Sequence, residues 1–365
     1  MAKKRRRIMV PYAVFTAVVI LAGLGIVYFF GFSGPRYVRS GEYATTTHIA
    51  LVKPLLDKKA YDRKLLAIAN ATTSLSDAQL AAYYASSTGT STKSLWPAKA
   101  PYPEYGALLP SHRIIAYYGN FYSKQMGVLG EYEPEVMLAK LKGEVAKWNA
   151  ADPTTPVVPA IDYIAITAQA SPVDGTYRAR MPDKEIDKAV ELAKQVNGIV
   201  ILDVQVGLSN LQTELPLLDK YLAMPQVHLA IDPEFSMKSG AKPGKEIGTF
   251  DAKDVNYAAQ HLAKLVQDND LPPKILVVHR FTQAMVTNYK QIKPLPEVQI
   301  VMDMDGWGPP AKKINTYQAF IYPEPVQFTG FKLFYKNDLK APSTRMLTPE
   351  DLLKLKPQPL FIQFQ

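Results

Sequence analysis

The sequence of 365 residues contains no cysteine. This absence excludes disulfide bonds, thiolate metal sites, a cysteine nucleophile and a lipid anchor attached to an N-terminal cysteine. Histidine is also scarce, with five residues, so a zinc site built from several histidines is not expected. The HExxH, GxSxG, Walker and kinase motifs are absent as well. These absences direct attention to carboxylate chemistry.

Positive charge is concentrated at the amino end of the chain. The net charge is +9, and the five basic residues at 3–7 supply five of these charges, which leaves four for the rest. No basic stripe or RNA-binding aromatic motif accompanies the remaining charges. We therefore expect no nucleic-acid partner.

An uncharged stretch of 25 residues, 8–32, follows the basic cluster directly. As a helix it would be about 38 Å long, enough to cross a hydrocarbon core of about 30 Å. It exceeds the apolar core of a signal peptide, roughly 7–15 residues, and no small-residue cleavage site follows, which favours an uncleaved anchor over a cleaved signal. Because basic flanks stay in the cytoplasm, residues 1–7 are expected to be cytoplasmic. The rest of this single-pass cell-membrane protein is expected to lie outside.

Residues 33–112 are expected to form an extracytoplasmic stalk. The spacing of apolar residues predicts a helix within 53–69 and another at 76–86, with Ser76 as its N-cap. A Ser/Thr-rich run and four prolines follow, a composition typical of extended, semi-rigid linkers.

From residue 113 to residue 365, short apolar runs alternate with helical stretches, which indicates repeated βα units and a parallel sheet. Strands are predicted at 113–119, 157–164, 198–205, 227–234, 274–281, 298–305, 330–335 and 359–364. Helices are predicted at about 133–149, 183–196, 212–223, 251–269, 283–290, 309–318 and 348–355. Eight such strands match a (β/α)8, or TIM, barrel domain. The alternative is an open doubly wound sheet, for which the glycine-rich phosphate loop is missing.

Polar residues gather where these strands end. In such barrels the active site lies at the carboxyl ends of the strands, and side chains alternate between the two faces of a strand. The fourth strand ends in Ile-Asp-Pro-Glu, so Asp232 and Glu234 share the inward face. The other inward polar residues are Tyr118, Asn120, Asp162, Asp203, Gln205, His279, Asp303, Asp305 and Gln363, with Arg280 in place of His279 if the fifth strand has the other register.

Several carboxylates in one barrel mouth repel one another, so their pKa values diverge and supply one acid and one base. The expected catalytic residues are Glu234 as general acid, Asp232 as its electrostatic partner or a substrate ligand, and Asp203 or Asp305 as base or nucleophile. For any single acid, a helix N-cap or a structural hydrogen bond is an equally good interpretation. Substrate binding is expected from Tyr118, Asn120, Asp162, Gln205, His279, Asp303, Trp307 and Gln363.

The loop DMDGWGPP adds a flat apolar ring to this set. Trp307 is expected to stack on a sugar, since an aromatic ring buries a large area, and packing at the barrel end is the alternative.

This pattern resembles the glycoside-hydrolase-like (β/α)8 superfamily over residues 113–365. Many retaining members carry the acid/base glutamate at the end of strand four, where Glu234 stands, and a nucleophile glutamate at the end of strand seven, where GFKLFYKN has none. The resemblance implies cleavage of an envelope or extracellular glycan without a cofactor. Two alternatives stay open. One is a silent barrel that binds a glycan or an envelope protein, and the other is an enzyme whose carboxylates hold a divalent metal.

Overall fold

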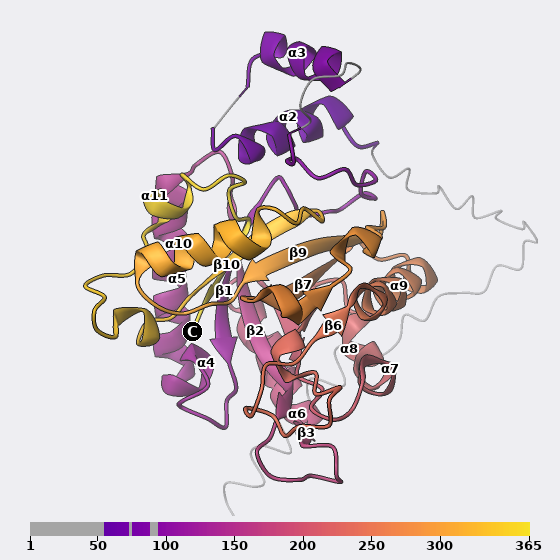
Figure 1. Ribbon diagram of the computed structural model, residues 1–365, viewed down its shortest axis with the longest axis vertical. Coiled ribbons are helices and arrows are strands. Elements are labelled where there is room, and N and C mark those ends of the chain that lie inside the picture. The colour runs from indigo at the N-terminus through magenta and orange to yellow at the C-terminus, as the bar shows by residue number, and fades with distance from the viewer. Residues whose placement is uncertain (1–54, 73–74, 88–93) are drawn as a thin grey trace, which may run out of the picture. The chain divides into compact units, whose positions relative to one another are not determined.

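The computed structural model describes residues 55–72, 75–87 and 94–365 (Figure 1). These residues belong to one compact unit that begins at Lys53. The predicted basic tail and the membrane anchor at 8–32 lie outside the described residues. Within the described ranges, no helix combines the length and apolarity that crossing a bilayer requires.

Eight parallel strands close into a barrel. In order around the ring they are β1 (Arg113–Gly119), β2 (Val157–Ala168), β4 (Ile199–Val204), β5 (Val227–Ile231), β7 (Lys274–Arg280), β9 (Val298–Met304), β10 (Phe328–Leu333) and β11 (Phe361–Phe364). The ring closes because β1 pairs with both β2 and β11. All eight predicted strands are confirmed, and so is the TIM-barrel class. A short strand, β3 (Arg178–Arg180), pairs antiparallel with the end of β2.

Helices follow the strands and lie outside the sheet (Figure 1). They are α4 (Val128–Glu131), α5 (Pro134–Ala151), α6 (Asp183–Lys194), α7 (Leu211–Glu214), α8 (Asp219–Leu222), α9 (Ala252–Asn269), α10 (Pro310–Thr316) and α11 (Pro349–Leu352). The helix predicted over 212–223 is split by the 3₁₀ turn η1 (Leu215–Leu218), where Pro216 removes a backbone donor. A π-helical turn, η5 (Tyr317–Ile321), extends α10.

The predicted helix at 283–290 was wrong. This segment contains the 3₁₀ turns η3 (Gln283–Met285) and η4 (Tyr289–Gln291) on either side of β8 (Val286–Thr287), which pairs with β6 (Phe250–Asp251). Asn288 adopts a left-handed conformation with φ of 57°, which interrupts a right-handed helix.

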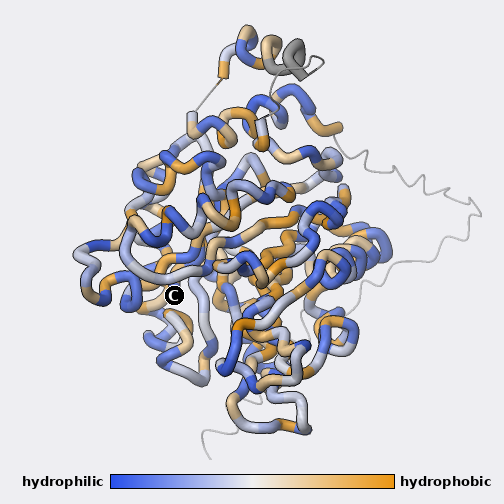
Figure 2. The backbone as a smooth tube through the Cα atoms, viewed as in Figure 1, coloured by the Kyte–Doolittle hydropathy of each residue, from blue (hydrophilic) through white to orange (hydrophobic). Residues whose placement is uncertain are grey.

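Two apolar layers hold the barrel together. Alternate residues of the strands, among them Ile201, Ala230 and Val277, form a cluster inside the ring. The intervening residues form a larger cluster between the sheet and the helices. Hydrophobic residues accordingly concentrate along the central strands (Figure 2). This alternation confirms the predicted inward faces. The polar residues on these faces lie toward the carboxyl ends of the strands.

The described part of the predicted stalk is not a separate spacer. The helix α2 (Lys58–Ala69) places Ile68 in the inner apolar cluster together with Leu109, and the Ile68 carbonyl accepts a hydrogen bond from the Gln358 N–H at 3.0 Å. The Trp96 indole donates to the Tyr322 carbonyl at 2.8 Å. The compact unit that contains the barrel extends from Lys53 to Gln365. Proline-rich composition predicts extended backbone, but it does not reveal whether apolar side chains find a surface to pack on.

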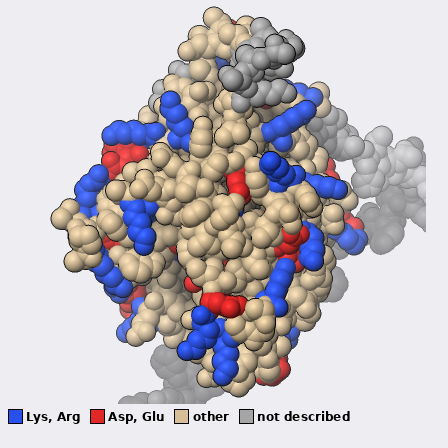
Figure 3. Space-filling model, viewed as in Figure 1, with Lys and Arg blue, Asp and Glu red and all other residues tan. Residues whose placement is uncertain are grey.

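A second helix, α3 (Asp77–Ser87), follows α2, and Ser76 caps it as predicted, because its hydroxyl accepts a hydrogen bond from the Gln79 N–H at 3.2 Å. Lysine and arginine side chains are spread around the visible face of the molecule and interspersed with acidic ones (Figure 3).

Candidate active site

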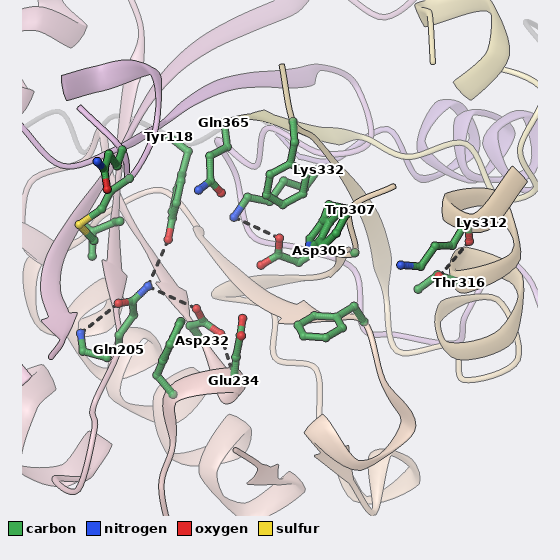
Figure 4. A pocket seen from close by; sticks show the side chains of 18 residues that line it. Tyr118, Gln205, Asp232, Glu234, Asp305, Trp307, Lys312, Thr316, Lys332 and Gln365 are labelled. Carbon is green, nitrogen blue, oxygen red and sulfur yellow. Dashed lines mark hydrogen bonds and ion pairs between the residues drawn. The ribbon is translucent and has the colours of Figure 1, made fainter. Parts of the chain in front are cut away.

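A cleft of about 460 Å³ opens at the carboxyl ends of the strands. Figure 4 shows the polar side chains that point into it from different strand ends. They are Tyr118 of β1, Gln205 after β4, Asp232 and Glu234 after β5, Asp305 after β9 and Lys332 of β10. Trp307 lies at the rim with 47% of its surface exposed. A polar floor beneath an aromatic edge is an arrangement suited to a hydroxyl-rich ligand with apolar ring faces.

Asp232 and Glu234 lie in a tight turn at the end of β5. Asp232 caps the 3₁₀ turn η2 (Pro233–Phe235), with its Oδ1 accepting a hydrogen bond from the Glu234 N–H at 2.9 Å. Its Oδ2 accepts a hydrogen bond from Gln205 Nε2 at 3.4 Å. Burial raises the pKa of Asp232 well above its ordinary value, because desolvation disfavours the charged form.

Glu234 lines the cleft, and its carboxyl group has a pKa close to neutral pH. Burial, followed by the negative charge of Asp305, raises the pKa of Glu234 to about 7. A carboxyl group with this pKa is suited to proton transfer near neutral pH.

Asp305 is held by a buried lysine. The Lys332 Nζ lies 3.1 Å from the Asp305 Oδ1 and 3.9 Å from the centroid of the Tyr118 ring, and the side chain of Lys332 is 4% exposed. Burial by itself would lower the pKa of Lys332, but the charges of Asp305, Asp232 and other acids outweigh it and raise the pKa. Lys332 is therefore a buried ammonium group that faces the cleft.

Beneath the cleft floor, His279 joins three acids. Its Nε2 lies 3.0 Å from Asp203 Oδ2, and its Nδ1 lies 3.2 Å from Asp303 Oδ2 and 3.5 Å from Asp305 Oδ2. Desolvation opposes protonation, but the Asp203 carboxylate and the other two raise the pKa of His279 well above its ordinary value. The three carboxylates thus favour the protonated, cationic form of His279 within the acidic layer. Gly330 provides room for Asp303, since a Cβ at Gly330 would lie 2.5 Å from its Oδ1.

Asp162 completes the buried layer. Its Oδ2 accepts a hydrogen bond from Gln363 Nε2 at 2.5 Å. Burial, followed by the charge of Asp203, raises the pKa of Asp162 to about 8, so the group is largely protonated at neutral pH. Asp162 is thus neutralised largely by a proton, whereas other acids of the layer lie beside side-chain cations, and in this way several carboxyl groups share one barrel.

The predicted site residues fall into three groups. Those that line the cleft are Tyr118, Gln205, Asp232, Glu234, Asp305 and Trp307. Those fully buried and absent from its lining are Asp162, Asp203, His279, Asp303 and Gln363. Asn120 forms the third group, because it does not line the cleft and its side chain serves the backbone instead. Its Nδ2 donates to the Ile164 carbonyl at 3.0 Å, and its Oδ1 accepts from the Tyr122 N–H at 2.9 Å. The catalytic and binding roles of these residues stay predictions.

The structure decides the register of the fifth barrel strand and adds one residue to the site that was not predicted. Arg280 pairs with Glu324, so His279 is the inward residue of its strand. Lys332 was missed, although its alternation with Phe331 and Leu333 assigns it to the inward face. Within the described part of the chain, no three histidine or acidic side chains form a group that could hold a metal ion.

No protein-family model matches the sequence, and neither does any curated protein. Among solved structures, the chain is similar to a GH5 family lichenase from Caldicellulosiruptor sp. F32, with a TM-score of 0.39 and 9% identity over 73% of this chain and 88% of that chain. It is also similar to a ruminal GH26 endo-beta-1,4-mannanase, with a TM-score of 0.36 and 14% identity over 70% of this chain and 59% of that chain. Both likenesses concern the fold alone and contribute nothing to the argument about function.

Proposed function

We propose that this protein is a glycoside hydrolase that uses carboxylate general acid/base chemistry. One observation carries the proposal: Glu234, with a pKa of about 7, lines the same cleft as the lysine-paired carboxylate of Asp305. Two carboxyl groups in one cleft, held in different environments, are the equipment that glycosidic bond cleavage requires.

Glu234 acts as the general acid in this proposal. Near neutral pH, Glu234 is protonated in a large fraction of the molecules. It donates this proton to the oxygen of the leaving sugar. The same carboxylate then accepts a proton from the attacking water in the second half of a retaining reaction, or stays a donor only in an inverting one.

Asp305 stabilises the oxocarbenium-like transition state as a carboxylate and acts as base or nucleophile. Lys332 and His279 contact its two oxygens and orient the carboxylate from below. The burial of Asp203 and its bond to His279 support Asp305 over Asp203 for this role, because Asp203 does not line the cleft. The seventh barrel strand, β10, carries Lys332 and no glutamate. The partner carboxylate, Asp305, therefore comes from the end of the sixth barrel strand, β9.

The substrate and location complete the proposal. Trp307 offers an aromatic surface to a sugar at the rim, and Tyr118 and Gln205 offer hydrogen-bonding groups on the floor. The apolar stretch at 8–32 and its basic flank support a membrane anchor with the barrel outside the cell. We accordingly propose an envelope or extracellular glycan as the substrate.

The test compares wild-type protein with Glu234→Gln on a panel of envelope and extracellular polysaccharides, and measures the release of reducing ends. Loss of the general acid is expected to lower turnover about 10²–10⁴-fold. Glu135→Gln, an acid-to-amide change at an exposed position of α5, is the matched control and is expected to keep full turnover. Unchanged turnover in Glu234→Gln would remove Glu234 from the mechanism.

A glycan- or protein-binding barrel without activity is the second candidate. It is favoured by the pairing of Asp305 with two buried cations, which weakens a carboxylate as base or nucleophile. This candidate predicts that wild-type protein and Glu234→Gln retain a bound glycan with equal affinity and that neither releases reducing ends.

A further inference from the structure

Two lysines that follow Trp307 in the sequence, Lys312 and Lys340, hold their ammonium groups beside its ring at the rim of the cleft. Lys312 lines the cleft, and its Nζ lies 4.9 Å from the centroid of the Trp307 ring. The Nζ of Lys340 lies 5.2 Å from the same ring. Both lysines are exposed, and neither forms an ion pair with an acid in the described ranges. Cation–π attraction keeps both charges beside the ring.

This grouping is fixed by a buried ion pair. Asp338 is 1% exposed, and its Oδ2 lies 2.8 Å from the Nζ of Lys313, the neighbour of Lys312. The Asp338 Oδ1 accepts a hydrogen bond from the Gly308 N–H at 3.0 Å, directly after Trp307. One carboxylate therefore joins the Trp307 loop, the start of α10 and the segment before Lys340. Lys312 in the cleft lining and Lys340 beside it therefore flank a Trp307 loop whose backbone is held by this carboxylate.

The acids of the cleft do not cancel these two charges. Asp305 is paired with Lys332, and the buried Asp232 carboxyl group accepts hydrogen bonds from the Glu234 N–H and from Gln205 Nε2, away from the two lysines. Glu234, with a pKa of about 7, is only partly ionised at neutral pH. At the Trp307 end of the cleft the uncompensated charge is therefore positive.

We infer that this cleft takes an anionic glycan, with Trp307, Lys312 and Lys340 forming a subsite for a sugar that carries a carboxylate or phosphate group. The ring packs against the apolar part of the sugar, and the ammonium groups meet its acidic substituent. This inference rests on the proposed function for the identity of the ligand as a glycan. It adds the charge class of the substrate, which the catalytic carboxyl groups do not determine.

The experiment measures binding to full-length Glu234→Gln protein, in which turnover does not remove the probes. The probes are uronic-acid-containing oligosaccharides, the same oligosaccharides with their carboxylates reduced to alcohols, and phosphorylated versions of the reduced ones. We expect an acidic probe to bind at least about tenfold more tightly than its neutral partner, and added salt to weaken only the acidic probes. The carboxylate and phosphate arms identify which acidic group is preferred.

Lys312→Gln combined with Lys340→Gln is expected to abolish this tenfold preference, since each exposed ion pair contributes a modest part of it. Lys142→Gln with Lys354→Gln removes two exposed charges outside the cleft and should leave the preference intact. Equal binding of acidic and neutral probes, no binding of any acidic probe, or an unchanged preference in the rim variant would overturn the inference. Charge-selective binding without turnover by wild-type protein would instead refute only the hydrolase proposal.

Discussion

Replacing Lys332 by methionine tests how the acidic layer of the barrel is stabilised. Methionine keeps most of the length of the side chain and removes the ammonium group. In the wild-type protein this group lies 3.1 Å from the Asp305 Oδ1 and 3.9 Å from the Tyr118 ring centroid, and the side chain is 4% exposed. The substitution thus leaves a buried carboxylate without its nearest cation.

The size of the effect follows from this geometry. At 3.1 Å and an effective dielectric constant of about 20, the attraction between two unit charges is about 5 kcal/mol. Removing one member of a buried pair costs about 3–5 kcal/mol in measured cases, because the partner charge stays desolvated. We therefore expect Lys332→Met to lower the free energy of unfolding by about 3–5 kcal/mol. Adding Asp305→Asn should recover part of this loss, since it removes the unpaired charge.

The assay is urea unfolding of the full-length protein at pH 7, followed by far-ultraviolet circular dichroism. Lys336→Met is the matched control, because Lys336 lies in the same segment and pairs with Glu131 at 2.8 Å while 69% exposed. An exposed pair of this kind contributes at most about 1 kcal/mol. Equal losses for Lys332→Met and Lys336→Met would refute the argument that Lys332 is a buried counter-ion.

Three further predictions follow from the site. The kcat/KM for glycan cleavage should fall about tenfold per pH unit above pH 7, because Glu234 loses its proton. In Lys332→Met this fall should begin at a higher pH, because Lys332 lowers the pKa of Glu234. The pKa of Asp162 is about 8 in the folded state, against an ordinary value of 3.8. Between pH 3.8 and about pH 8, the folded state therefore binds a proton that the unfolded state has lost, and the free energy of unfolding falls as pH rises. Asp162→Asn should flatten that fall in urea midpoints measured from pH 5 to pH 8, and an unchanged slope would contradict it. Gly330→Ala should cost about 1–3 kcal/mol in the same assay, because the new Cβ would lie 2.5 Å from a carboxylate oxygen, whereas Gly143→Ala on α5, with nothing within 4 Å, should cost nothing.

The strands and their inward faces could be predicted because one physical rule governs both. A strand buried between helices and a barrel interior must alternate its side chains, so apolar runs locate the strand and the period of two assigns each face. Asp232, Glu234 and Asp305 were placed in the cleft on this basis, and the structure brings them together. The packing of Ile68 against the barrel could not be predicted, because the composition of segment 55–112 describes local backbone preference alone.

The depth of each side chain could not be predicted. Asp203 and Asp305 share the inward face by the same rule, yet Asp203 is fully buried and Asp305 lines the cleft. Barrel strands are tilted and staggered relative to one another, so the position along a strand does not translate directly into height along the barrel axis. Lys332 was not predicted for another reason, because the resemblance to glycoside hydrolases implies a carboxylate, and not a lysine, on this strand, β10.

The closure of the ring has a consequence for the order of events during protein synthesis. β1 pairs on one side with β2, which follows soon after it, and on the other with β11, which is made roughly 240 residues later. At about 5–20 residues per second, the second edge of β1 stays unpaired for roughly 10–50 s after it leaves the ribosome. An open, apolar strand edge of this kind is a template for pairing with another chain. Pairing of β11 with β1 therefore removes, as the last step of synthesis, an edge that stays available to other chains until then.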